Sequence, residues 1–138
     1  MMKIVVKVEW CVKNYAGGWG YPGIGAIIST GKTLEEFKDD FKDAVEFHLD
    51  GMTEDGDNLP QWAVDRDYEI EFELAMTAIL HEVEKFTTLK AISKASGIKL
   101  PTLKQYASGD INPKEAQCEK IINAIRVIAQ NLMDLTLA

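Results

Sequence analysis

The chain has 138 residues, 46% of them hydrophobic, which suits one ordinary domain or two small ones with packed cores. Its formal net charge of −7 is divided unevenly: residues 1–85 carry 8 basic and 18 acidic side chains, whereas residues 86–138 carry 7 and 4. These counts correspond to −10 and +3. The second part can therefore approach phosphate, while the first would repel nucleic acid and suits a basic partner.

Cysteine usage and hydropathy predict the compartment. Cys11 and Cys118 are far apart and form no CxxC pair, which favours a reducing environment without disulfides. We expect both to serve as small buried hydrophobic side chains. No charged-plus-apolar leader opens the sequence, and no apolar run approaches the length of a membrane span. We therefore expect a soluble, cytoplasmic protein.

The first part of the chain has the pattern of a small antiparallel meander. Lys3–Val12 is rich in Val and Ile, and its side chains alternate between two faces. Asn14–Gly18 is typical of a turn. Trp19–Tyr21 and Gly25–Ser29 are candidates for two further short strands.

A helix and a fourth strand should follow the meander. Thr33–Gly51 has apolar residues at spacings of three and four, and Thr33 with Glu36 forms the capping box T-x-x-E at its start. An acidic loop is expected over residues 53–67. Tyr68–Leu74, YEIEFEL, alternates apolar and acidic residues without interruption, which predicts a strand with one wet face.

The second part of the chain is predicted to be mainly helical. Ala75–Phe86 has helical spacing, and Thr87–Gly109, TTLKAISKASGIKLPTLKQYASG, predicts two short helices joined by a tight turn. Lys114–Gln130 predicts a last helix with a buried stripe of isoleucines, and the apolar tail after it could extend the helix or form a strand. We consider this helix and tail the candidates for dimerisation. The fold class is therefore α+β, a β-β-β-α-β domain followed by an all-helical domain.

The segment Thr87–Gly109 has the features of a helix-turn-helix, a motif whose second helix enters the major groove of DNA. Ser93 is small enough for close helix crossing, Gly97 suits the sharp turn, and Gly109 ends the second helix. We expect Ile98, Leu103 and Tyr106 to point inward. A helical hairpin that only packs or dimerises is the alternative interpretation.

The outward positions of the second helix predict how DNA would be read. Gln105 can pair with adenine through two hydrogen bonds, whereas Lys99 and Lys104 suit phosphate contacts. Leu100 and Pro101 can contact only a thymine methyl. The full set of candidate DNA-binding residues is Lys99, Leu100, Pro101, Thr102, Lys104, Gln105 and Ser108.

The order of the two parts resembles the HicB family of antitoxins. The resemblance rests on GKTLEEF (Gly31–Phe37) after short strands, and on GIKLPTLKQYASG (Gly97–Gly109) followed by a proline. It implies a partial RNase H-like antitoxin domain over residues 1–74 and a lambda-repressor-type helix-turn-helix domain over residues 75–138. It further implies a small basic HicA-like toxin that cleaves mRNA, repression of the shared operon, and no enzymatic activity. The weakly basic surface of one copy separately predicts that DNA is bound by a dimer or higher oligomer.

The resemblance also suggests where the toxin docks. The candidate toxin-binding residues are the acidic face of the first helix, namely Asp39, Asp40, Asp43, Glu46 and Asp50. A merely solvated helix face is the alternative for these side chains. The three tryptophans are few and scattered along the sequence, so we expect no platform for base stacking.

Catalysis is not predicted. A metal-dependent nuclease of RNase H type needs several converging carboxylates, and although Glu9 lies on the first strand, no spacing forces such convergence. His48 and His81 have no second ligand at a metal-binding spacing, and no nucleophile motif is present. We expect no catalytic residue, no metal and no cofactor. The alternative functions are a stand-alone helix-turn-helix regulator and, less favoured, the nuclease.

Overall fold

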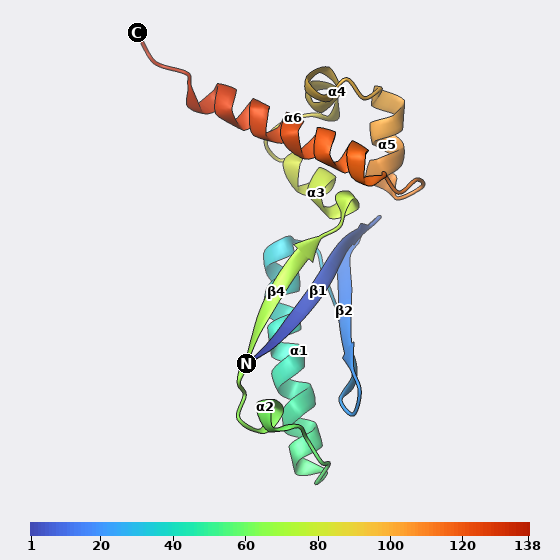
Figure 1. The fold of residues 1–138 in the computed structure, drawn as a ribbon, viewed down its shortest axis with the longest axis vertical. Coiled ribbons are helices and arrows are strands. Elements are labelled where there is room, and N and C mark those ends of the chain that lie inside the picture. The colour runs from blue at the N-terminus through green and yellow to red at the C-terminus, as the bar shows by residue number, and fades with distance from the viewer. The chain divides into compact units, whose positions relative to one another are not determined.

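The structure, a computed structural model, describes all 138 residues of the chain (Figure 1). Strands and one long helix come first and helices follow, so the predicted α+β class is confirmed. The chain divides into two compact units, Met1–Ala75 and Met76–Ala138. None of the helices combines the length and the apolar character that a membrane span requires.

The first unit is built on a four-stranded sheet of strand order β3-β2-β1-β4. β1 (Met2–Cys11), β2 (Asn14–Tyr21) and β3 (Gly25–Gly31) form an antiparallel meander, as expected. β4 (Tyr68–Leu74) is a strand where the alternation predicted one, and it pairs in parallel with β1. A parallel pair needs a long crossover, which the helical segment between β3 and β4 supplies.

The turn expected at Asn14–Gly18 is wrong, because this segment lies inside β2. The chain instead turns at Val12 and Lys13, where Val12 has a left-handed φ of 58°. Gly17 is in the strand for a packing reason. A Cβ atom there would lie 2.6 Å from the carbonyl oxygen of Lys7 and 3.0 Å from the ring of Phe37. Glycine thus permits close packing rather than a turn at this position.

One face of the sheet is covered by α1 (Leu34–Glu54), which buries Phe37, Phe41, Val45 and Leu49. The predicted N-terminal cap is confirmed, since the Thr33 hydroxyl accepts a hydrogen bond from the Glu36 N–H at 3.0 Å. The helix continues past Gly51, the end predicted from the sequence, to Glu54. The segment expected to be an acidic loop also contains a short helix, α2 (Gln61–Val64).

The second unit is a bundle of four helices around one apolar core. The sequence-based expectation that Ile98, Leu103 and Tyr106 point inward is confirmed, since all three are buried with Leu80, Ile92, Ile121 and Ala124. The helices are α3 (Met76–Val83), α4 (Leu89–Ser96), α5 (Leu100–Ser108) and α6 (Glu115–Met133). The apolar tail extends α6 by three residues beyond Gln130 and then has no regular structure from Asp134.

The two cysteines are not both buried. Cys11 is exposed at the end of β1, which corrects the expectation of a small buried side chain there. It lies on the sheet face opposite α1, because side chains of a strand alternate between faces and the even-numbered Val6 and Val8 are the ones buried beneath the helix. Cys118 is half-buried, with its Sγ 3.7 Å from the carbonyl oxygen of Pro113.

Candidate functional site

The helix-turn-helix segment is held by caps at each of its ends. The hydroxyl of Thr88 accepts a hydrogen bond from the Ala91 N–H at 3.1 Å and starts α4. Gly97 ends α4 in the left-handed conformation, with φ 77°. The Ser93 hydroxyl then donates to the carbonyl of Ile98 at 2.5 Å, so Ser93 also fixes the turn itself. α5 ends at Gly109, again left-handed with φ 85°.

One face of α5 is turned to solvent. Pro101, Lys104, Gln105 and Ser108 are exposed, and their spacing of three, four and seven residues places them on one side of the helix. Leu103 is buried on the opposite side. Four of the seven candidate DNA-binding residues therefore share one accessible face.

The other three candidates sit at the start of α5. Lys99 is exposed and is the N-cap residue, whereas Leu100 and Thr102 are half-buried. Ser108 is also less available than its exposure indicates, since its hydroxyl donates to the Gln105 carbonyl at 3.1 Å. The side chains of Lys104 and Gln105 have no hydrogen-bond partner within the chain and are the polar groups best placed to meet a ligand.

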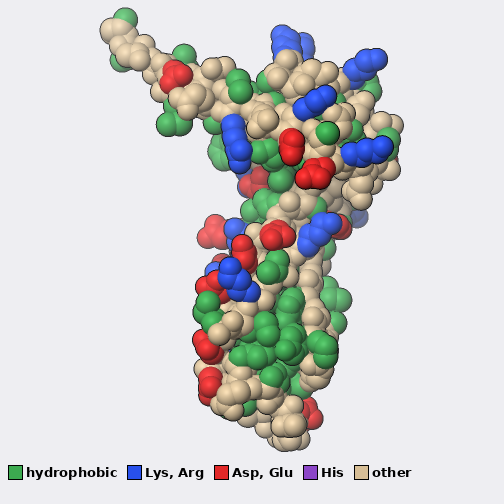
Figure 2. Space-filling view, viewed as in Figure 1, with side chains coloured by type: hydrophobic (Ala, Val, Ile, Leu, Met, Phe, Trp, Pro, Cys, Tyr) green, Lys and Arg blue, Asp and Glu red, His purple; other side chains and the backbone are tan.

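The electrostatics of this segment suit a polyanion. Residues 86–109 contain four lysines and no acidic residue. Lys90, Lys94, Lys99 and Lys104 are all exposed, and basic side chains are prominent on the second unit in Figure 2. Although the chain as a whole is acidic, this local positive surface is suited to contacts with phosphate groups.

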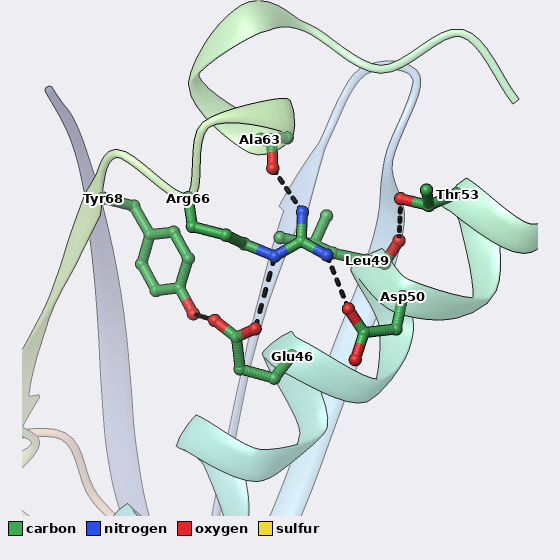
Figure 3. Close-up of polar contacts among 7 residues, drawn as sticks. All are labelled: Glu46, Leu49, Asp50, Thr53, Ala63, Arg66 and Tyr68. Atoms are coloured by element: carbon green, nitrogen blue, oxygen red, sulfur yellow. Dashed lines mark hydrogen bonds and ion pairs between the residues drawn. The ribbon is translucent and has the colours of Figure 1, made fainter.

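The acidic residues of α1 are all exposed, but they do not form one uncommitted charged face. Asp40 accepts a hydrogen bond from the buried Ser29 hydroxyl. Glu46 and Asp50 are both engaged by Arg66, with its Nε 3.3 Å from Glu46 and its Nη2 2.6 Å from Asp50 (Figure 3). Of the five candidate toxin-binding residues, only Asp39 and Asp43 have no partner within the chain.

Arg66 organises a network that the sequence did not reveal. Its guanidinium also donates to the carbonyl of Ala63 in α2, and the Tyr68 hydroxyl donates to Glu46 (Figure 3). Burial and the hydrogen bond to Glu46 raise the pKa of Tyr68. Partial burial opposes charge on Arg66, but its contacts with Asp50 and Glu46 outweigh this and raise its pKa. These residues fasten the α2 segment and the start of β4 to α1.

An aromatic cluster in the first unit contradicts the expectation of scattered tryptophans. Trp19 and Tyr21 of β2 are stacked with ring centroids 5.6 Å apart. Trp62 of α2 lies edge-on to both, at 6.1 and 5.5 Å, and 6.4 Å from Tyr68 of β4. All four side chains are half-buried. The spacing of Trp19 and Tyr21 placed them on one strand face, but the approach of Trp62 depends on the tertiary fold.

The groups considered for catalysis do not gather into a centre. Nowhere do three His, Cys, Asp or Glu side chains come together as a metal ion would require. His48 has a structural contact instead: its Nε2 lies 2.6 Å from the carbonyl oxygen of Ile24 and ties α1 to the turn before β3. Glu9 lies exposed on the uncovered face of the sheet.

Comparison with known proteins identifies no relative. No protein-family model, curated protein or solved structure matches the chain.

Proposed function

We propose that this chain is the antitoxin of a type II toxin–antitoxin pair. The first unit binds and masks a small basic toxin that cleaves mRNA, similar to HicA. The second unit binds an operator in the shared operon and represses it. The action is stoichiometric, so no catalytic residue or cofactor takes part.

The observation that carries the DNA-binding half is the accessible face of α5. Gln105 offers both an amide donor and an acceptor, which match the edge of adenine in the major groove. Lys99 and Lys104 lie at the start and the middle of this helix and hold phosphates, which position the protein without specifying sequence. One such segment has few basic groups, so a dimer on a two-fold operator supplies the affinity.

The toxin-binding half is supported by the charge of the first unit. Residues 1–75 carry 16 acidic and 7 basic side chains. Such a surface accelerates encounter with a basic protein and disfavours nucleic acid. The family resemblance of the sequence, with an antitoxin domain before a helix-turn-helix, agrees with this division of tasks.

The test is a pull-down of the tagged full-length chain from its native cells, with mass spectrometry of proteins recovered in stoichiometric amount. We expect one small basic protein, and this protein should lose ribonuclease activity when the chain is added back. A preparation that binds operator DNA but recovers no partner from cells expressing the operon would favour a stand-alone transcriptional regulator instead.

A further inference from the structure

The ladder between β1 and β2 is incomplete. Their pairing runs from Cys11↔Asn14 to Lys7↔Gly18 and stops there. β1 continues to Met2, paired only with β4, and β2 continues to Tyr21, paired only with β3. In Figure 1 the two strands accordingly separate toward the amino end of β1. The central strand of the sheet thus has an unpaired stretch.

The direction of the N–H and C=O groups in this stretch of β1 follows from the hydrogen bonds that β1 makes on its β4 side. The N–H of Met2 and the C=O of Val8 both bond on the β4 side, at 3.0 and 2.8 Å. Because successive residues of a strand direct these groups to opposite sides, Lys3 and Val5 direct theirs away from β4. Gly20 of β2 has the parity of Gly18, the last residue paired with β1, and faces the same stretch.

The side chains beside the unpaired stretch are aromatic. Trp19 and Tyr21 belong to the separated end of β2, and Trp62 packs against both. Figure 2 shows hydrophobic side chains gathered over the first unit where β1 and β2 separate. The buried Nε1 of Trp62 has no hydrogen-bond acceptor in the chain. An apolar surface next to unpaired backbone groups has the chemistry that binds an extended peptide.

The charge beside this stretch indicates what kind of peptide. On the uncovered face of the sheet, Glu69 and Glu71 flank Lys3, with carboxylate oxygens 4.0 and 3.7 Å from its Nζ. Two carboxylates facing one ammonium leave a net negative charge. Because side chains of a strand alternate between faces, an added strand would direct one set toward the aromatic cluster and the other toward these acids.

We propose that the unpaired stretch of β1 accepts an extended segment of a partner protein whose side chains alternate between apolar and basic. The segment adds a strand beside Lys3 and Val5, with its apolar side chains against Trp19, Tyr21 and Trp62. The inference rests on the proposed function, because it specifies the segment by which the first unit holds its basic partner. It also distinguishes this surface from the acidic face of α1.

The experiment uses the full-length chain and a capped peptide of about six alternating valines and lysines, a typical strand length. Amide exchange is followed by NMR with and without the peptide. We expect exchange at Lys3, Val5 and Gly20 to be fast in the free chain and to slow by about tenfold at saturating peptide. The amide of Lys7, already paired, should not change. A peptide of the same composition with its valines and lysines in two blocks should protect more weakly.

Two variants connect the protection to the surface. Trp19→Ala should weaken peptide binding by about tenfold, whereas Phe47→Ala, a matched change at an aromatic residue of α1 that is 83% exposed, should leave it unchanged. Because Trp19→Ala can also loosen the fold, Glu69→Lys combined with Glu71→Lys serves as a second variant. Because both residues are exposed, these two substitutions should weaken peptide binding without altering the thermal midpoint of the chain.

The outcomes separate this inference from the proposed function. Protection at Lys3, Val5 and Gly20 supports the strand-addition site even where the pull-down recovers no toxin. Absence of protection, or protection confined to the α1 surface around Asp39 and Asp43, overturns it. Capture of the toxin in equal amount by wild type and both variants would likewise overturn it while leaving the antitoxin function intact.

Discussion

Arg66 shows how one side chain can determine which surface of the first unit remains available. It has a left-handed φ of 54°, an unfavourable conformation for a residue with a Cβ. The contacts of its guanidinium with Glu46, Asp50 and the Ala63 carbonyl compensate for that cost. Two of the candidate toxin-binding acids, Glu46 and Asp50, therefore serve the fold, and their carboxylates share the single positive charge of Arg66.

Tyr68 makes the stability of the first unit sensitive to pH in the alkaline range. Its pKa is raised in the folded state above the ordinary value of 10.0, chiefly by burial and by the hydrogen bond to Glu46. The folded state therefore holds the phenolic proton more tightly than the unfolded chain does. This contribution is fully present below about pH 10 and is lost as the pH rises further.

As the pH rises above about 10, we expect the free energy of unfolding of the wild type to fall more steeply than that of Tyr68→Phe. Urea unfolding at several pH values measures this difference. Tyr106→Phe in the second unit is the control, because both variants remove one phenol. Parallel curves for wild type and Tyr68→Phe would show that the Tyr68–Glu46 contact does not hold the proton.

Gln105 and Lys104 are adjacent on α5 but have different tasks in the proposed DNA complex. Gln105→Ala should cost about 1–3 kcal/mol on the correct site and relax the preference at one base pair. Lys104→Ala should weaken binding to all duplexes and flatten the salt dependence. Titrations of operator and random DNA at several salt concentrations measure both effects, with Lys42→Ala in α1 as the control. Equal losses for both variants on both kinds of DNA would contradict the assignment.

At the scale of elements, the turn between α4 and α5 depends on a backbone conformation rather than on side-chain space. A Cβ added to Gly97 would meet nothing within 4 Å, yet its φ is 77°. Gly97→Ala should therefore destabilise the second unit by about 1–2 kcal/mol through backbone strain alone. The same substitution should disturb the orientation of α5 and thereby lower the affinity for the operator.

Gly51→Ala is the matched control for that substitution. Gly51 also has nothing within 4 Å of an added Cβ, but it lies in the interior of α1 with ordinary helical geometry. Alanine there should stabilise the first unit by up to about 1 kcal/mol. Thermal or urea unfolding of both variants measures the contrast. Similar effects of the two substitutions would mean that the left-handed turn is not needed.

At the scale of the whole molecule, the end of α6 and the tail after it expose several large apolar side chains close together in the sequence. The last buried residue of α6 is Ala124, and the large apolar side chains exposed beyond it are Val127, Leu132, Met133, Leu135 and Leu137. Exposed apolar residues in such number are typical of an association surface. The proposed dimer on a two-fold operator needs one.

We expect the wild type to sediment as a dimer or higher oligomer and Leu132→Lys combined with Met133→Lys to sediment as a monomer. The double variant should also lose affinity for a two-fold operator while retaining the weak binding of a single half-site. Lys120→Glu, on an exposed position earlier in α6, controls for changes of charge. A monomeric wild type at micromolar concentration would exclude this surface as the dimer interface.

Local patterns were sufficient for most of the secondary structure. The alternation of Tyr68–Leu74, the Thr33 cap and the inward positions Leu103 and Tyr106 were all predictable, because each depends on neighbours within one strand, turn or helix. The strand position of Gly17 was not predictable in this way, because glycine is required there by the ring of Phe37, which approaches it only in the folded state.

The features of the candidate sites also fall into those that local sequence predicts and those that depend on contacts between distant segments. The α+β order, the two short helices joined at Gly97 and the exposed stripe of Pro101, Lys104 and Gln105 were predictable from local patterns, since helical spacing assigns residues to faces. Three features could be seen only in the folded chain: Arg66 pairs with Glu46 and Asp50 of α1, Trp62 packs against Trp19, and Val5 of β1 has a strand partner in β4 but none in β2. These features join segments distant in the chain, and no local periodicity encodes which distant side chains and strand edges meet.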